Sequence, residues 1–252
     1  MKPLPTCVSM ETCFFDSGLS GGIKMITLHY LNNSRSQRIL WLLEELGLEY
    51  RVQHHERDKE TQLAPESLKK VHPLGKAPVI TDGDLTLAES GAIVDYLAQT
   101  YGREALLPAA DSPAWWDYVY WLHYAEGSLM PPLLMRYVFD RVKAAPVPFF
   151  VRPLVNRIVT EVDKAFLRQQ IKTHLDFVED HLSCHDWLVD GRFGAADIQL
   201  SFPLEAALSR TGMGGQYPRI RDYVAQLQAR PAYLRALKAG GPYAYGPAVT
   251  PP

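Results

Sequence analysis

The segment Leu74–Gly91, which reads LGKAPVITDGDLTLAESG, limits the fold of this chain more than any other. Pro78 cannot donate a hydrogen bond within a sheet, so the apolar pair after it is expected to begin a strand. Asp82–Gly83 predicts a two-residue hairpin turn of type I′. Leu85–Leu87 alternates as a half-buried strand does, and Glu89–Gly91 opens a helix. The segment therefore predicts a strand, a tight turn, a second strand and a helix start.

The same segment contains two features of a ligand site. If the bond between Ala77 and Pro78 is cis, Ala77 turns its backbone N–H and C=O outward, where an extended peptide can pair with them. The helix start at Ser90 offers free N–H groups and the positive end of a dipole, which suit a carboxylate. A peptide-like ligand with a carboxylate at one end fits both features. The alternative is a structural hairpin followed by a capped helix.

Composition excludes several other classes of protein. The 252 residues are 47% hydrophobic and 21% charged, with a net charge of −2, so nucleic acid is not an expected partner. No apolar run approaches the ~18 residues that a membrane span requires. Three scattered cysteines, Cys7, Cys13 and Cys184, indicate a reducing, cytoplasmic setting. His181 and His185 lack a third ligand nearby, so no metal site is expected.

The first half of the chain alternates strands and helices. Including the opening segment, the order is βαβαββα, with a parallel first pair of strands and an antiparallel last pair. This is a thioredoxin-like α/β arrangement. The expected strands outside the opening segment are Met25–Tyr30 and Glu49–His54, and the expected helices are Arg35–Leu46, Pro65–Val71 and Ala92–Thr100.

The second half shows only helical patterns. We expect an all-α domain over residues 114–238, separated from the thioredoxin-like domain (25–101) by a linker at 102–113. Residues 1–24 and 239–252 are predicted to be tails, the first of them disordered. Prolines at 131–132 and 146–148 are expected to bend or break the first helices. Thr160–Leu182 is expected to be a long amphipathic helix, and Ala195–Leu208 the central, strongly apolar one.

Three motifs in this order resemble the cytosolic glutathione transferases, over about residues 25–238. They are His72–Pro78, Leu87–Ser90, and Leu188–Gly191 with Ala196–Ile198. The sequence looks most like the fungal membrane-associated transferases and their bacterial relatives.

One position departs from the family pattern. Gly194 stands where the family usually has the Ser or Thr of a helix-capping box, with Asp197 at the expected third helical position. Glycine is only a few tenths of a kcal/mol worse than serine as an N-cap, so the helix should form. Asp197 is therefore expected to be structural.

The resemblance implies how glutathione binds as a co-substrate. Ala77, before a cis Pro78, would pair with the cysteinyl backbone of glutathione. Ser90 would hold the γ-glutamyl carboxylate, Glu89 would lie near the γ-glutamyl amino group, and Lys76 would meet the glycyl carboxylate. The resemblance also implies a homodimer, with the aromatic helix at 114–130 as its candidate interface, and a role in detoxification without a metal.

The chemistry requires an ionised thiol. A free thiol has a pKa of about 8.5, and lowering it by about two units takes roughly 2.7 kcal/mol of preferential thiolate stabilisation. A hydroxyl donor and a helix N-terminus together can supply this. Ser34, between the first strand and the first helix, is the first candidate, although it can equally be an N-cap. Asn33 and Asn32 are rivals because an amide N–H also donates, and Tyr30 is a weaker one.

The predicted function is conjugation of the glutathione thiolate to small hydrophobic electrophiles. Tyr120 and Tyr124 are candidates to line an electrophile pocket between the domains, although core or dimer packing is the commoner role of such aromatics. One alternative is a glutathione-dependent peroxidase or disulfide reductase on the same site. Another is a non-catalytic binding module of the same fold.

Overall fold

The structure is a computed structural model that describes residues 25–58, 61, 63–212 and 214–247. Its N-terminal half contains a four-stranded mixed sheet in the order β2-β1-β3-β4. The strands are β1 (Ile26–Leu31), β2 (Tyr50–His55), β3 (Val79–Asp82) and β4 (Leu85–Ala88). β1 pairs in parallel with β2, whereas β3 runs antiparallel to both β1 and β4. The thioredoxin-like prediction is thus confirmed. The predicted N-terminal tail, with Cys7 and Cys13, lies outside the described residues.

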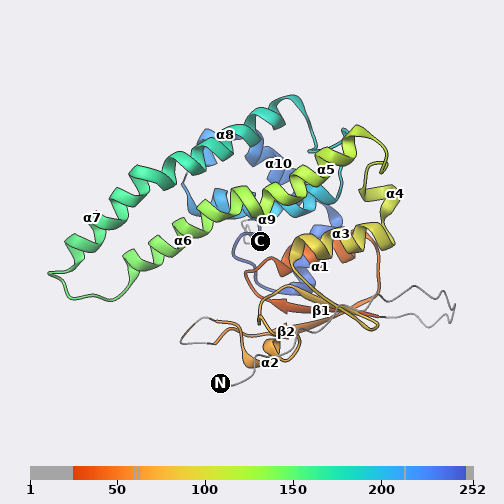
Figure 1. The fold of residues 1–252 in the computed structure, drawn as a ribbon, viewed down its shortest axis with the longest axis horizontal. Coiled ribbons are helices and arrows are strands. Elements are labelled where there is room, and N and C mark those ends of the chain that lie inside the picture. The colour runs from red at the N-terminus through yellow and green to blue at the C-terminus, as the bar shows by residue number, and fades with distance from the viewer. Residues whose placement is uncertain (1–24, 59–60, 62, 213, 248–252) are drawn as a thin grey trace, which may run out of the picture.

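Helices cover both faces of this sheet (Figure 1). α1 (Ser36–Glu45) and α3 (Ser90–Tyr101) lie between the sheet and the helical domain, and the short α2 (Glu66–Lys69) lies on the opposite face. A short α4 (Arg103–Leu106) follows α3. α1 is held in place by the apolar stripe expected from the sequence, since its residues from Ile39 to Leu43 are completely buried.

The hairpin between β3 and β4 forms one residue later than the sequence predicted. Asp82 pairs with Leu85 in the ladder, so the two turn residues are Gly83 and Asp84. Only Gly83 has a positive φ, 60°. A type I′ turn needs positive φ at both central positions, so that prediction is wrong; a glycine at the first position alone is typical of type II′.

The C-terminal half is helical. Its elements are α5 (Pro113–Tyr124), α6 (Met130–Ala144), α7 (Arg152–Val162), α8 (Arg168–Cys184), α9 (Ala195–Arg210), α10 (Pro218–Gln228) and α11 (Pro231–Gly240), with π-helical turns η1 (Ala125–Leu129) and η2 (Asp163–Leu167) and a 3₁₀ turn η3 (Gly214–Gln216). α6 and α7 project from the body as a pair (Figure 1). Prolines 131–132 do not break the helix, because they lie in its first turn after η1, where a missing N–H costs little.

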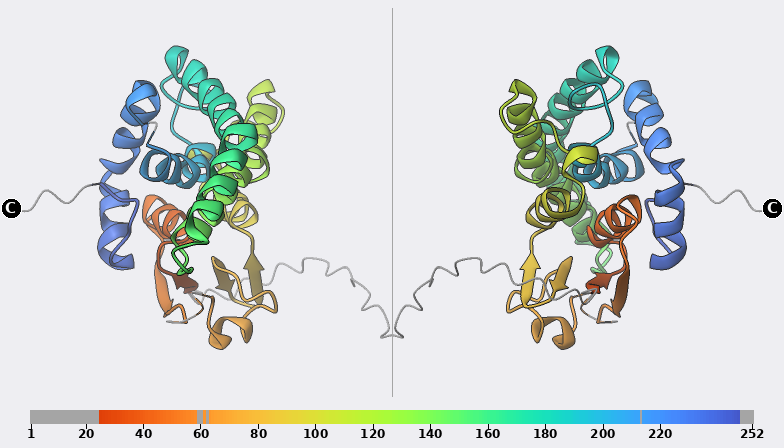
Figure 2. Two further views of the ribbon diagram at one scale, coloured as in Figure 1. Left: turned by 90° about the vertical axis from the view of Figure 1, so that its left-hand side faces the viewer. Right: turned by 90° about the vertical axis from the view of Figure 1, so that its right-hand side faces the viewer.

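α9 is the centre of the molecule, as its apolar sequence predicted. Its residues from Ala195 to Ala207 are all buried. It packs against α5, α10, α1 and α3, so one apolar core runs through both domains. Figure 2 shows the sheet on one side of this core and the long helices on the other.

Asp197 holds the start of α9 in place. Its carboxylate accepts hydrogen bonds from the backbone N–H groups of Gly194 (2.7 Å) and Leu188 (3.1 Å) and from the hydroxyl of Tyr223 (2.5 Å). The structure also explains the glycine at 194, since a Cβ there would lie 2.8 Å from the carbonyl oxygen of Leu106. The family's usual serine would not fit at this close approach.

The segment after α11 packs against the N-terminal domain. We call its described part, residues 241–247, the C-terminal strap. α11 itself lies along α1, close enough that a Cβ at Gly240 would be 2.8 Å from the Tyr30 hydroxyl. In the strap, Tyr243 donates a hydrogen bond to buried Glu205 at 2.6 Å, and the Tyr245 carbonyl accepts one from Gln228 at 3.0 Å. The strap is therefore anchored to α9 and α10.

Candidate active site

Strand register brings three segments to one end of the sheet. His29 of β1 pairs with Val79 of β3, so the loop that follows β1 lies beside the residues that precede β3. Val79 in turn pairs with Ala88, so the residues that follow β4 emerge at the same end. The loop at 31–34, the Ala77–Pro78 pair and the Glu89–Ser90 pair are thereby neighbours, although they are far apart in sequence.

The bond between Ala77 and Pro78 is cis, the geometry the sequence argument required for a peptide-binding backbone. Lys76 beside it is exposed, and Ala77 is half-buried. Glu89 is exposed and has a φ of 69°, in the left-handed region that non-glycine residues rarely occupy. Such backbone strain is concentrated at functional sites. Ser90 then begins α3 and is 4% exposed.

Ser90 is held by a buried arginine that comes from α1. The Arg38 guanidinium donates a 2.5 Å hydrogen bond to the Ser90 hydroxyl oxygen and another to the carbonyl of Gln199 on α9. Because Ser90 oxygen accepts this bond, its own hydroxyl proton stays available to donate to a ligand. Arg38 is 2% exposed, so its charge acts in a poorly solvated environment.

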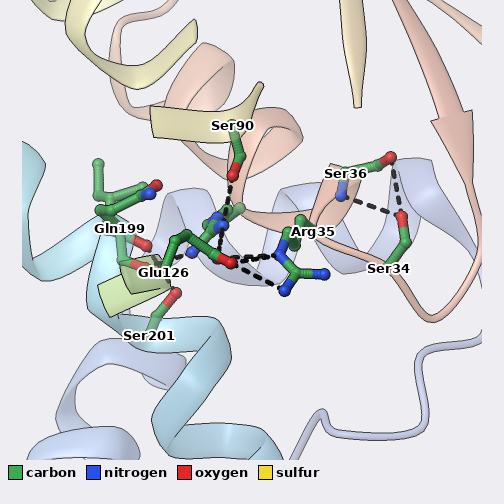
Figure 3. Close-up of polar contacts among 9 residues, drawn as sticks. Ser34, Arg35, Ser36, Ser90, Glu126, Gln199 and Ser201 are labelled. Atoms are coloured by element: carbon green, nitrogen blue, oxygen red, sulfur yellow. Dashed lines mark hydrogen bonds and ion pairs between the residues drawn. The ribbon is translucent and has the colours of Figure 1, made fainter. Parts of the chain in front are cut away.

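Glu126 in η1 balances the charge of this arginine (Figure 3). Its carboxylate forms ion pairs with Arg38 and with Arg35, the latter at 2.8 Å. Burial opposes ionisation of Glu126, but the two guanidinium groups outweigh it and lower the carboxyl pKa to about 2. The N-terminus of α1, the start of α3 and the helical domain are thus joined by one charged cluster: Arg35, Arg38, Ser90 and Glu126.

Ser34 turns its hydroxyl into its own loop. The oxygen donates to the Leu31 carbonyl at 2.6 Å, lies 2.9 Å from the Ser36 hydroxyl and accepts a 3.1 Å bond from the Ser36 N–H (Figure 3). The Ser34 carbonyl also accepts the N–H of Gln37. The Ser34 hydroxyl is thus engaged within its own loop, while Arg35 takes the N-cap position of α1 without a side-chain cap. A hydroxyl has one proton, so Ser34 must leave Leu31 before it can donate elsewhere.

Asn33 is arranged differently. It is exposed and has a φ of 50°, and its Oδ1 accepts a 2.7 Å hydrogen bond from the backbone N–H of Ala244 in the C-terminal strap. Because only the oxygen accepts this bond, the NH₂ group of the amide remains available as a donor. Asn32 is also exposed.

Two groups of predicted residues lie away from this loop. The Tyr30 ring is buried, its hydroxyl donates to Gln37 at 2.8 Å, and burial raises its pKa to about 12. Tyr124 places its hydroxyl 3.0 Å from Nδ1 of His174 on α8, and Tyr120 stacks on Tyr124. The ring and hydrogen-bond contacts of these two tyrosines are all within α5 and α8, so the structure does not bring them together with Ser34.

Sequence reasoning missed Glu126 and the C-terminal strap. Glu126 follows the aromatic run of α5 within a largely apolar stretch, and such an isolated acid is a signal that it pairs with a cation from elsewhere. Ala244 offered no signal, because its contribution is a backbone N–H. Nowhere in the described ranges do three His, Cys, Asp or Glu side chains gather in a way that holds a metal ion.

Comparison with known families agrees with this geometry. Residues 23–99 match the glutathione S-transferase N-terminal domain, and residues 140–226 match the C-terminal domain of the same proteins. Glutathione S-transferase 1 of Saccharomyces cerevisiae is 35% identical over 219 residues, 84% of this chain and 93% of the yeast protein. Glutathione S-transferase 3 of Schizosaccharomyces pombe is 34% identical over 82% of this chain and 85% of its own. Disulfide-bond oxidoreductase YfcG of Escherichia coli is 27% identical over 84% of this chain and 94% of its own.

Solved structures show the same architecture. A glutathione S-transferase from Actinobacillus pleuropneumoniae is 37% identical with a TM-score of 0.71, covering 87% of this chain and 94% of that one. A glutathione transferase homologue from Lodderomyces elongisporus, solved with two glutathione molecules per subunit, is 25% identical with a TM-score of 0.68, covering 86% and 100% of the two chains. Among the described residues, no helix combines the length and the apolar character needed to cross a bilayer. The chain belongs to the glutathione S-transferase family.

Proposed function

We propose that this protein conjugates the thiolate of glutathione to small hydrophobic electrophiles in the cytoplasm, in a detoxifying role. The observation that carries the proposal is the convergence of a cis Ala77–Pro78 bond, the helix start at Ser90 and the loop at 31–34 at one end of the sheet. Ala77 pairs with the cysteinyl backbone of glutathione and Ser90 donates to the γ-glutamyl carboxylate, with Arg38 behind it. Glu89 meets the γ-glutamyl amino group, and Lys76 meets the glycyl carboxylate.

The loop at 32–34 stabilises the thiolate in this proposal. Two donors are available there, the Ser34 hydroxyl and the Asn33 amide. Their hydrogen-bond contacts in the structure differ. Ser34 donates to the Leu31 carbonyl and must rotate before it reaches a sulfur atom. The Asn33 oxygen accepts from the Ala244 N–H, and among the described residues no hydrogen bond engages its NH₂ group. The geometry therefore favours Asn33, with Ser34 as the alternative donor.

Calorimetry of glutathione binding tests the proposal, combined with the ultraviolet absorbance of the bound thiolate as a function of pH. The wild type is expected to bind glutathione and to lower the thiol pKa well below 8.5. Asn33→Ala is expected to raise that pKa while affinity is kept, and Ser34→Ala to leave it unchanged. The reverse result assigns the role to Ser34. Ser209→Ala, an exposed position on α9, serves as the matched control. A wild type that does not bind glutathione would contradict the transferase function and favour a non-catalytic module.

A second function uses the same site. The relationship to YfcG supports glutathione-dependent disulfide reduction, in which the thiolate attacks a disulfide sulfur and releases the other half as a thiolate. A second glutathione then attacks the mixed disulfide and yields glutathione disulfide. Reduction of hydroperoxides is the related alternative. Turnover of 2-hydroxyethyl disulfide or cumene hydroperoxide, with little conjugation of 1-chloro-2,4-dinitrobenzene, would favour these activities.

We also propose that the protein is a homodimer. Apolar side chains on α5 and α6 are exposed in the single chain, including Trp116 at 71%, Val138 at 51% and Leu134 at 48%. Exposed apolar patches of this kind mark association surfaces. Light scattering that reports a mass near 28.4 kDa, that of one chain, would contradict the dimer. A Trp116→Lys variant that becomes monomeric would place the interface on α5.

A further inference from the structure

A row of cationic and aromatic side chains leads from the loop at 31–34 to α6. The Arg35 guanidinium lies 5.3 Å from the ring centre of Phe202, whose edge meets the ring of Tyr245 at 5.7 Å. Tyr245 lies 4.7 Å from the guanidinium of Arg210, and the Tyr137 ring lies 4.4 Å from the same group. Arg210 is therefore held between two tyrosines, one from the C-terminal strap and one from α6.

The guanidinium of Arg210 is unusual because it is half-buried without a hydrogen-bond partner among the described residues. Within the part of the chain that the structure describes, no hydrogen bond or ion pair engages its guanidinium, although the side chain is half-buried. Asp140, a carboxylate close enough to influence it, is bound to Arg136 at 3.2 Å. Burial lowers the pKa of Arg210, although Tyr137, Tyr243 and Asp140 act in the opposite direction. A guanidinium with five donors, in contact with two aromatic rings and without a hydrogen-bond partner in the described ranges, can bind a planar anion.

Two chains of contacts connect Arg210 with the loop that carries Asn33 and Ser34. Tyr245 follows Ala244, whose N–H binds Asn33, so two adjacent residues of the strap connect Arg210 with the loop at 31–34. On the other side, Phe202 connects the row to Arg35, the neighbour of Ser34. Both routes connect Arg210 through side chains and the strap to the loop at 31–34.

We propose that Arg210 binds a carboxylate on the second substrate and so makes this enzyme selective for anionic electrophiles. The inference rests on the proposed transferase function and adds a specificity-determining residue to it. Tyr137 and Tyr245 both contact the guanidinium, whose N–H groups form a fork that matches the two oxygens of a carboxylate. Glu126 forms ion pairs with both Arg35 and Arg38, whereas Arg210 has no ion pair among the described residues.

A matched pair of substrates tests this selectivity. 4-Chloro-3,5-dinitrobenzoate and its methyl ester differ in the negative charge and one methyl group, and their uncatalysed rates with glutathione are measured alongside to correct for intrinsic reactivity. In both, the thiolate sulfur forms a bond to the chlorinated ring carbon, chloride leaves with the electrons of the C–Cl bond, and the thiol proton passes to solvent. The wild type is expected to favour the carboxylate over the ester in kcat/KM. Arg210→Gln should reduce this ratio about tenfold, as loss of a hydrogen bond to a charge implies. Its KM for glutathione should be unchanged.

Control variants distinguish carboxylate recognition by Arg210 from a purely structural role of this side chain. Arg221→Gln removes an exposed arginine of α10 and should leave the ratio unchanged. Arg210→Lys should restore the ratio only in part, because an ammonium lacks the planar fork. An equal fall in kcat/KM for both substrates in Arg210→Gln would overturn the inference. It would show that Arg210 only holds the strap against α6.

A binding measurement keeps this inference separate from the transferase function. 3,5-Dinitrobenzoate and its methyl ester carry no leaving group, so calorimetry with them requires no turnover. Tighter binding of the acid, lost in Arg210→Gln, supports the anion site even if conjugation is absent. Equal binding of acid and ester by the wild type overturns it even if conjugation proceeds.

Discussion

Asn33 and Ala244 are 211 positions apart in the chain, yet the N–H of Ala244 donates to the side-chain oxygen of Asn33 at 2.7 Å. The C-terminal strap therefore sets the orientation of an amide in the active-site loop. Tyr243 and Tyr245 on either side of Ala244 are themselves anchored to α9 and α10, so the donor is held in a fixed position.

Removing that single donor should change the chemistry without removing glutathione. Ala244→Pro lacks the N–H, whereas Ala244→Gly keeps it. If Asn33 is the thiolate donor, the proline variant should raise the pKa of the bound thiol and lower kcat about tenfold, with a small change in the KM for glutathione. The measurement is steady-state kinetics with the thiolate titration described above. Identical thiol pKa values in the two variants would show that the contact does not matter.

The Arg38–Glu126 pair should be important for stability. Glu126→Gln leaves the buried Arg38 without its counter-charge and is expected to lower the free energy of unfolding by about 3 kcal/mol. Arg35→Gln removes a cation that is 30% exposed and should cost about 0.5–1 kcal/mol. Urea unfolding of both variants checks this difference, and equal losses would contradict it.

Acid should weaken the same cluster. The pKa of Glu126 is about 2 in the folded protein, below its usual value of 4.5, so its contribution is present above pH 4.5 and is lost as pH falls toward 2. The wild type should consequently lose stability more steeply over this range than Glu126→Gln does. Parallel acid transitions would contradict the assignment.

The histidine pair of the sheet should produce a second pH dependence. Nδ1 of His29 lies 3.2 Å from Nε2 of His55, and burial first, with neighbouring positive groups second, lowers the pKa of both. The unfolded state then binds more protons below pH 6.5, so stability from the neutral pair is lost as pH falls below that value. The slope is at most about 1.4 kcal/mol per pH unit for each histidine.

The His55→Gln variant distinguishes the pH dependence of the histidine pair from that of other groups that titrate near pH 6. Burial raises the pKa of Asp197 to about 6, which has the opposite sign, because that contribution is lost as pH rises through 6. Since Asp197 is common to both proteins, the difference between wild type and His55→Gln isolates the pair. Unfolding at pH 7.5 and 5.5 should show a larger loss for the wild type, and a larger loss for the variant would contradict the assignment.

Position 194 should reverse the ordinary capping rule. Serine is normally the better N-cap, but at 194 its Cβ would lie 2.8 Å from the Leu106 carbonyl oxygen. Gly194→Ser is therefore expected to destabilise the fold by about 1–3 kcal/mol. Gly215→Ala, where a Cβ meets nothing within 4 Å, is the control. A rise in melting temperature for Gly194→Ser would show that the backbone moves aside.

Local patterns were sufficient to predict the fold. Alternation, the helical stripe of α1 and the proline before β3 each depend on residues close in sequence, and the order of elements βαβαββα followed from them. The hairpin turn was misassigned because Asp82–Gly83 and Gly83–Asp84 are both acceptable turn pairs. The ladder decides between them, since Asp82 pairs with Leu85.

The site was predictable only where its residues form a contiguous motif. Ala77, Pro78, Glu89 and Ser90 belong to such motifs, and the structure places them at one end of the sheet. The Arg38–Glu126 pair joins residues 88 positions apart, and Arg210 gains its tyrosines from α6 and the strap. Such partnerships are settled by packing between domains, which no local pattern encodes.

The strap contact has a consequence for how this site evolves. Because the donor to Asn33 is main chain, every residue type except proline supplies it equally well. Selection on the contact would then leave position 244 free to vary, while it would preserve the length of the strap and its two anchoring tyrosines. Relatives can thus retain the contact with unrelated residues at position 244. What they would share is the number of residues between the two anchoring tyrosines.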